Sequence, residues 1–129
     1  MEAQIEVTES TVNVDAVLEG YIACALCTSV DEEETPLDKL DTVVLDETMA
    51  AMRADVVKFI ALVESTIPGG FGPWDDEQIG HDLWLSRNHH GTGFWDRGHG
   101  ELGETLHKLA GTMGERWLYL GVDGEVFQG

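Results

Sequence analysis

The chain has 129 residues, of which 43% are hydrophobic, and its 25 acidic and 7 basic residues give a formal net charge of −18 at pH 7. This length and composition predict one domain over residues 1–129 and exclude an intrinsically disordered chain. The charge repels phosphate backbones and anionic membranes, and no apolar run is long enough for a membrane helix, so we expect no direct binding to nucleic acid or membrane.

The first element in chain order is a short strand at residues 4–8, where polar and apolar side chains alternate. Asn13 or Asp15 can then cap a helix that runs to about Thr28. A C-x-x-C pair lies deep inside this helix, and not at the start of a helix directly after a strand, where a redox pair usually stands. We therefore expect two reduced packing thiols there, more than a redox or metal site.

An acidic connector follows at residues 29–42, and its run of like charges predicts a solvated loop. Asp46 is positioned to cap a second helix, from Glu47 to about Ser65. Apolar side chains recur along this helix at alternating steps of four and three residues, which is the clearest amphipathic stripe in the chain. We expect that stripe to pack into the core.

A proline- and glycine-rich break separates the second helix from the third. The third helix is predicted to start at Asp75, with Gln78 as its capping-box partner, and to end near Arg87. The segment after it contains too much glycine to be helical throughout. A fourth helix is predicted over about residues 101–113, and Gly114 ends it.

The C-terminus predicts a β-hairpin, in which residues 116–121 alternate, Asp123 and Gly124 form the turn, and residues 125–127 return. A lone hairpin is marginally stable in water, so the strand at residues 4–8 is the expected third member of its sheet. The predicted fold class is α+β, with about four helices packed on a small antiparallel sheet.

The negative charge is concentrated at the start of the chain, since residues 1–50 hold 13 acidic residues and one basic residue, Lys39. An acidic surface attracts a partner with a basic surface, and its carboxylates can take the place of DNA phosphates. The alternative is that the acidity only keeps the protein soluble. The candidate partner-binding residues are Asp31, Glu32, Glu33, Glu34, Asp38 and Asp41.

Chemically active side chains also gather between Gly80 and Glu101, which include four of the five histidines, two arginines, two aspartates and three aromatic residues. This segment is open to three interpretations: a metal site, a catalytic or nucleotide-binding site, and a polar network that holds an irregular loop to the core. The candidate ligand-site residues are His81, Asp82, Arg87, Asn88, His90, Phe94, Trp95, Asp96 and Arg97.

In the metal interpretation, imidazole and carboxylate groups would suit zinc or a similar ion. The chain has no tight metal-binding signature, and we expect no cofactor. The candidate ligands in this interpretation are Asp82, His89, His99 and Glu101.

In the catalytic or nucleotide-binding interpretation, Arg87 and Arg97 would grip a phosphate or carboxylate. Phe94 and Trp95 would stack on a base, and a histidine beside an aspartate would act as general base. The sequence identifies no nucleophile and no known phosphate-binding loop, and we therefore name no catalytic residue.

In the structural interpretation, the two arginines would pair with Asp82 and Asp96, and histidines would donate to loop carbonyl groups. Such a network satisfies a loop that lacks regular hydrogen bonds. Trp84, Phe94 and Trp95 would then anchor the loop in the core.

The motif Gly80-His-Asp-Leu-Trp-Leu-Ser-Arg-Asn-His-His-Gly-Thr-Gly-Phe-Trp-Asp-Arg-Gly98 resembles the shared core of a family of short tailed-bacteriophage proteins, most without a functional name. The family usually has glycine where His89 stands, so His90 matches the family histidine. Weaker similarity extends to residues 21–34 and 118–124. The family provides no catalytic residue to transfer. It implies synthesis in the cytoplasm of an infected bacterium, which agrees with an N-terminus unlike a signal peptide.

Charge and resemblance together predict a phage-encoded acidic interaction protein. It would bind the basic surface of a host protein or nucleoprotein complex and inhibit a nucleic-acid-handling or defence complex, as anti-CRISPR and anti-restriction proteins do, including by DNA mimicry. One alternative is a small enzyme or a nucleotide- or metal-binding protein that uses residues 80–101. Another is a phage modulator of replication or transcription proteins. The sequence permits a monomer or a dimer.

Overall fold

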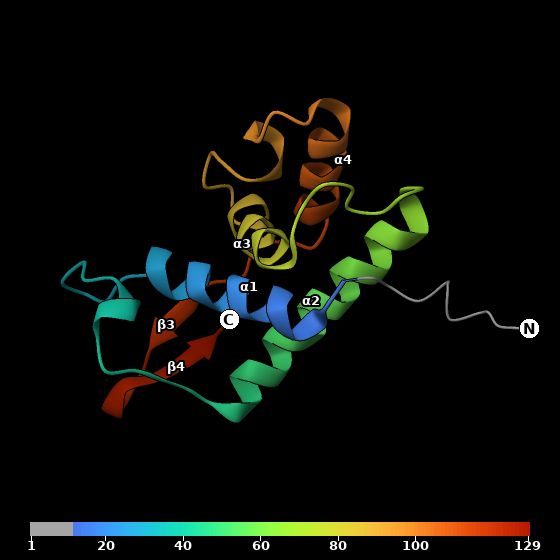
Figure 1. Cartoon of the computed structure of the whole chain (residues 1–129). Helices are drawn as coiled ribbons and strands as arrows, with labels where there is room; N and C mark the ends of the chain where they lie inside the picture. Colours follow the sequence, from blue (N-terminus) through green and yellow to red (C-terminus); the bar gives the residue numbers. More distant parts are fainter. Residues whose placement is uncertain (1–11) are drawn as a thin grey trace, which may run out of the picture.

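Four α-helices and a three-stranded sheet form the part of the chain that the computed structural model describes, residues 12–129 (Figure 1). The fold class is α+β, as the sequence predicts. The strand expected at residues 4–8 lies outside the described residues. The helices are α1 (Val14–Thr28), α2 (Asp46–Thr66), α3 (Asp76–Arg87) and α4 (Gly100–Gly111).

The sheet is mixed rather than purely antiparallel. Strands β3 (Leu118–Leu120) and β4 (Glu125–Gln128) form the predicted hairpin, with positive φ angles of 61° at Asp123 and 78° at Gly124 in its turn. Strand β2 (Val43–Val44) pairs with β4 in parallel, so the strand order is β2-β4-β3. A strand of two residues shows no alternation, which is why the sequence does not reveal it.

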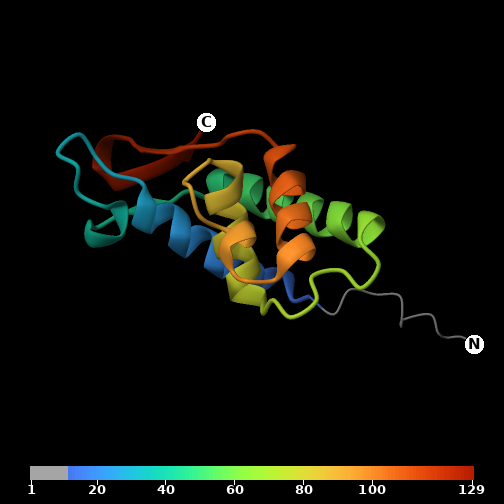
Figure 2. The same ribbon diagram turned by 90° about the horizontal axis from the view of Figure 1, so that it is seen from above.

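Helix α3 lies between α1 and α4 in the helical part of the molecule (Figures 1 and 2). Its last turns are covered on every side, since residues 82–88 are all buried. Helix α1 comes especially close, because Gly20 and Gly80 leave no side chains between the two backbones at their crossing. The motif at residues 80–98 therefore begins on the most enclosed helix of the fold.

Two of the three predicted helix caps are confirmed. Asn13 caps α1 by accepting hydrogen bonds from two backbone N–H groups of its first turn. Asp75 caps α3 by accepting a 2.9 Å hydrogen bond from the backbone N–H of Gln78. The expected capping box is not formed, because the side chain of Gln78 donates to Asp82. The prediction for Asp46 is wrong, because Asp46 is the first residue of α2 and Leu45 holds the N-cap position without a side-chain hydrogen bond.

The connector at residues 29–42 is more ordered than the solvated loop that its charge predicts. The backbones of Val30 and Pro36 form a β-bridge. Leu37 begins the single-turn helix η2 (Leu37–Lys39) and is fully buried. Leu37 thus fixes an acidic segment to the core. The charges of the segment do not predict this contact.

An aromatic cluster joins α2 to the segments on either side of α3. The ring centroid of Phe59 lies 5.8 Å from that of Phe71 and 5.7 Å from that of Phe94. The ring centroids of Trp74 and Phe94 are 5.6 Å apart. Phe94 begins the single-turn helix η3 (Phe94–Asp96), so this cluster holds the glycine-rich loop against the core. No helix within residues 12–129 has the length and apolar character needed to cross a membrane.

Candidate functional site

The carboxylate of Asp82 is the centre of the polar contacts in the 80–101 segment. This side chain is fully buried, and its oxygens accept four hydrogen bonds. Trp74 Nε1 and Gln78 Nε2 each donate over 2.9 Å, and Arg97 donates from Nε over 3.2 Å and from Nη2 over 2.7 Å. The hydrogen bond to Asp82 raises the pKa of Arg97. Four bonds use the acceptor capacity of a carboxylate, so Asp82 is committed to the fold.

Arg87, at the end of α3, ties three parts of the chain together and is only 1% exposed. Its Nη1 donates to the hydroxyl of Tyr21 over 3.0 Å and to the carboxylate of Asp55 over 2.9 Å. Its Nε and Nη2 donate to the carbonyl oxygens of Gly114 and Met113 over 2.8 and 3.0 Å. Burial raises the pKa of Tyr21 to about 12, so this hydroxyl stays protonated. The guanidinium of Arg87 therefore makes its hydrogen bonds to other groups of the same chain.

The partner of Arg87 differs from the one that the structural interpretation expects. Arg97 pairs with Asp82 as expected, at 2.7 Å, whereas Arg87 pairs with Asp55 of α2. Asp55 lies 32 residues before Arg87 in the chain, and no local pattern links them. The catalytic interpretation needs both arginines turned toward a ligand, and both guanidinium groups instead donate to groups of the chain.

Buried and capping hydrogen bonds hold the loop after α3. Asn88 is buried, donates from Nδ2 to the carbonyl oxygen of Trp84 over 3.1 Å, and accepts from the backbone N–H of Arg116 over 2.9 Å. Asp96 accepts from the Thr92 hydroxyl over 2.6 Å and from the backbone N–H of Gly93 over 3.1 Å. The hydrogen bond from Thr92 makes the largest contribution to lowering the pKa of Asp96, and the hydrogen bond from Gly93 lowers it further.

The aromatic side chains of the segment divide between the core and the surface. Trp84 and Phe94 are fully buried, and Trp84 Nε1 donates to the hydroxyl of Thr28 over 2.8 Å. Trp95 is 46% exposed, so it is not the core anchor that the structural interpretation expects. Its ring centroid lies 6.4 Å from that of His107 on α4.

The histidines of the segment all lie on the surface, where none of the hydrogen bonds to loop carbonyls expected of them is formed within residues 12–129. His81 is exposed on α3. His90 has its ring centroid 5.9 Å from that of Trp117, and burial lowers its pKa. The second loop histidine, His89, places Nε2 3.6 Å from the carboxylate of Glu115.

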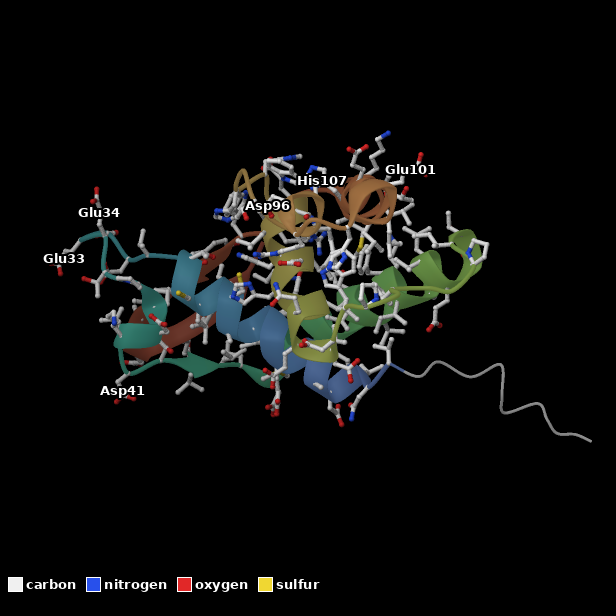
Figure 3. All side chains as sticks on the ribbon, turned by 45° about the horizontal axis from the view of Figure 1, so that its top comes forward. Glu33, Glu34, Asp41, Asp96, Glu101 and His107 are labelled. Atoms are coloured by element: carbon white, nitrogen blue, oxygen red, sulfur yellow. The ribbon has the colours of Figure 1, made fainter. Side chains whose placement is uncertain are left out.

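The four candidate metal ligands do not converge. The carboxylate of Asp82 is occupied by hydrogen bonds, His89 lies beside Glu115, and the ring centroid of His99 is 4.6 Å from that of Trp74. Glu101 is exposed on the first turn of α4 (Figure 3). In the described chain, no three histidine, cysteine, aspartate or glutamate side chains are grouped to hold a metal ion.

The acidic candidates lie at a different end of the molecule, where residues 31–34 form a turn that we call the acidic turn (Figure 3). Asp31 organises it, because its Oδ1 accepts from the backbone N–H groups of Glu33 and Thr35 over 2.9 Å each. Glu34 has a left-handed φ of 66°. The carboxylates expected on an unstructured loop are therefore presented by a folded turn, whose exposed members are Glu32, Glu33 and Glu34, with Asp38 and Asp41 exposed further along.

An open groove of about 530 Å³ lies between the acidic turn and β3. Its apolar wall includes Val30 and Tyr119, which are 48% and 53% exposed. The sequence does not reveal this groove. Alternation along the hairpin indicates that Tyr119 is exposed, but nothing in the sequence places the hairpin beside the turn. The groove is lined by Val30, Asp31, Glu32, Glu33, Tyr119 and Leu120.

No protein-family model matches this chain, and neither a curated protein nor a solved structure is significantly similar to it. The resemblance to bacteriophage proteins therefore rests on the motif and the weaker similarity around it, and no comparison supports it. The choice among the functions considered above rests on the charges, burial and contacts of the chain itself.

Proposed function

We propose that this protein is an interaction protein that binds the basic surface of a host protein or nucleoprotein complex and blocks its nucleic-acid site. The observation that carries the proposal is the acidic turn, which holds Glu32, Glu33 and Glu34 exposed on a hydrogen-bonded scaffold. A basic groove that binds DNA attracts such carboxylates for the same electrostatic reason that it attracts phosphates.

The paired basic residues leave a large unpaired excess of acidic residues. Arg53, Arg87 and Arg97 each form an ion pair with an aspartate of the same chain. Each of these pairs is neutral as a unit, so the formal net charge of −18 comes from acidic residues outside them. A field of this sign accelerates association with a basic partner and weakens as salt is added.

The resemblance to short phage proteins supports an origin in an infected bacterium. Restriction enzymes, CRISPR complexes and the proteins of replication and transcription all present basic grooves to nucleic acid. Inhibition of a defence complex, in the manner of an anti-CRISPR or anti-restriction protein, and modulation of replication or transcription are thus two outcomes of one binding mode, and the identity of the partner decides between them.

The structure gives less support to an enzyme built on residues 80–101. Asp82 and Arg87 are buried and their polar groups bond within the chain. A polar network within the chain accounts for Asp82, Arg87, Asn88 and Arg97, so we assign the partner surface to the acidic turn instead.

The proposal is tested by affinity capture from bacterial lysate followed by competition with duplex DNA for the captured protein. The test variant carries Glu32→Gln, Glu33→Gln and Glu34→Gln. The matched control removes the same number of charges from exposed positions elsewhere, with Glu64→Gln, Glu101→Gln and Glu104→Gln.

We expect the natural chain and the control to displace DNA from the captured protein, and the acidic-turn variant to lose that ability. Affinity should fall steeply between about 0.05 M and 0.5 M salt, because exposed charges are screened over shorter distances at higher ionic strength. A partner that binds both variants equally, with no dependence on salt, would refute the proposal.

A further inference from the structure

The outer edge of β3 is open to pairing with another strand. In the order β2-β4-β3, strand β3 stands at the end of the sheet, and within residues 12–129 no strand pairs with its outer side. Trp117 and Gly129 exchange backbone hydrogen bonds of 3.1 and 3.0 Å, and the N–H of Gly121 donates to Glu125. Since such pairs alternate along antiparallel strands, the N–H and C=O groups of Leu118 and Leu120 point away from β4.

The groove described above begins at this edge. It is bounded on one side by Tyr119 and Leu120 of β3 and on the other by the acidic turn. Its volume of about 530 Å³ lies within the range of about 300–1,000 Å³ typical of ligand sites. The groove therefore combines an unpaired strand edge, an exposed tyrosine ring and two exposed glutamates, Glu32 and Glu33.

We propose that an extended, basic segment of the partner adds to the outer edge of β3 and places lysine or arginine side chains against Glu32 and Glu33. The unpaired N–H and C=O groups of Leu120 require a backbone in strand conformation, which excludes a helix as the paired element. The charge of the facing wall requires a cationic segment. An arginine beside Tyr119 would also lie over the face of the tyrosine ring, whose π electrons attract a cation. This inference rests on the proposed function and adds to it the conformation and chemistry of the bound segment.

A second copy of this chain is a poorer occupant of the same edge. It would bring another acidic turn and another net charge of −18 to a site already lined by carboxylates. Like charges held at short range oppose association, so the charge pattern at this edge disfavours a dimer built by sheet extension.

The test uses the full chain and a synthetic probe, an eight-residue peptide of alternating arginine and valine. A peptide of alternating glutamate and valine is its control. Binding is measured by titration, and hydrogen exchange of the Leu120 amide is followed by NMR. We expect the basic peptide to bind, to slow exchange at Leu120, and to lose affinity in the variant with Glu32→Gln and Glu33→Gln, while the acidic peptide does not bind.

A proline at position 120 separates strand pairing from attraction by charge. Leu120→Pro removes an N–H that points away from β4, so no hydrogen bond of the hairpin is lost, and proline is tolerated at such edge positions. The lost hydrogen bond and the bulk of the ring should weaken binding of the basic peptide by about fivefold to tenfold. If this variant does not fold, the exchange of the Leu120 amide in the natural chain decides the question.

Three results would overturn the inference. Unchanged affinity in Leu120→Pro without protection of the Leu120 amide would show that charge alone binds the peptide, which leaves the proposed function standing. Equal binding to the natural chain and the Glu32/Glu33 variant would exclude the groove. A dimer in light scattering with the Leu120 amide protected before peptide is added would show that a second copy occupies the edge.

Discussion

Gly20 and Gly80 make the crossing of α1 and α3 possible. A methyl group on Gly80 would overlap the carbonyl oxygen of Val17, and one on Gly20 would overlap the carbonyl oxygen of Glu77. Each glycine thus accommodates the backbone of the opposite helix. The contact brings α1 against the helix that carries Asp82 and Arg87, so the polar network of the motif depends on it.

The first prediction concerns this crossing. Gly80→Ala should lower the free energy of unfolding by about 1–3 kcal/mol, because overpacking of a close contact forces backbone shifts. Gly111→Ala is the matched control: it lies at the end of α4, where a methyl group meets nothing within 4 Å. The control should be neutral or stabilise the protein by up to about 1 kcal/mol, since alanine is the better helix former. Urea denaturation measures both, and equal effects would contradict the prediction.

The second prediction concerns the buried carboxylate. Asp82→Asn removes the charge that Arg97 faces and replaces one of the two acceptor oxygens by an NH2 donor. We expect a loss of about 1–3 kcal/mol, the usual cost of leaving buried donors without an acceptor, because Arg97 is partly exposed and can be solvated. Asp96→Asn, which changes an exposed capping carboxylate, should cost less. Denaturant unfolding compares the two variants. A larger loss of stability in Asp96→Asn would contradict the assignment of Asp82 as the centre of the network.

The features that the sequence predicts correctly are those encoded by neighbouring residues. Asn13 and Asp75 cap helices a few residues away, and the Asp123-Gly124 pair forms its own turn. Each needs only a side chain of the right length or a residue that accepts a positive φ. Helix number, hairpin and fold class follow from such signals.

The features that the sequence misses depend on residues far apart in the chain. β2 pairs with β4 across some eighty positions, and the hydroxyl of Thr48 donates to the carbonyl oxygen of Val126 over 2.9 Å across 78 positions. Asp55 pairs with Arg87 for the same non-local reason. The groove requires a turn and a strand that meet only in the folded chain, so the sequence indicates its acidic wall and not its apolar wall.

The third prediction concerns pH. Burial lowers the pKa of His90 and of His107, and His89 lowers that of His107 further. In the unfolded chain these histidines have their ordinary pKa of about 6.5. As the pH is lowered below that value, the unfolded chain binds more protons at these sites than the folded chain does, so the free energy of unfolding decreases. The variant with His90→Gln and His107→Gln should lose less stability than the natural chain between about pH 7 and pH 5.

Two measurements check this prediction independently. Urea denaturation across the pH range gives the difference between variant and natural chain, which removes the contribution of carboxylates common to both. NMR titration gives the histidine pKa values directly. Midpoints for His90 and His107 at or above the ordinary histidine value would contradict the prediction, whatever the unfolding curves show.

The fourth prediction concerns the C-x-x-C pair of α1. Cys24 is buried, and burial raises its pKa to about 12, whereas Cys27 is exposed. Since the thiolate is the reactive form, a thiol reagent near pH 8 should modify Cys27 rapidly and Cys24 only on unfolding. Cys27→Ser should abolish the rapid phase, Cys24→Ser should retain it, and denaturant should release two thiols from the natural chain. Equal rates for both thiols in the folded protein would mean that α1 opens at the core side, which the packing of Gly20 against α3 makes unfavourable.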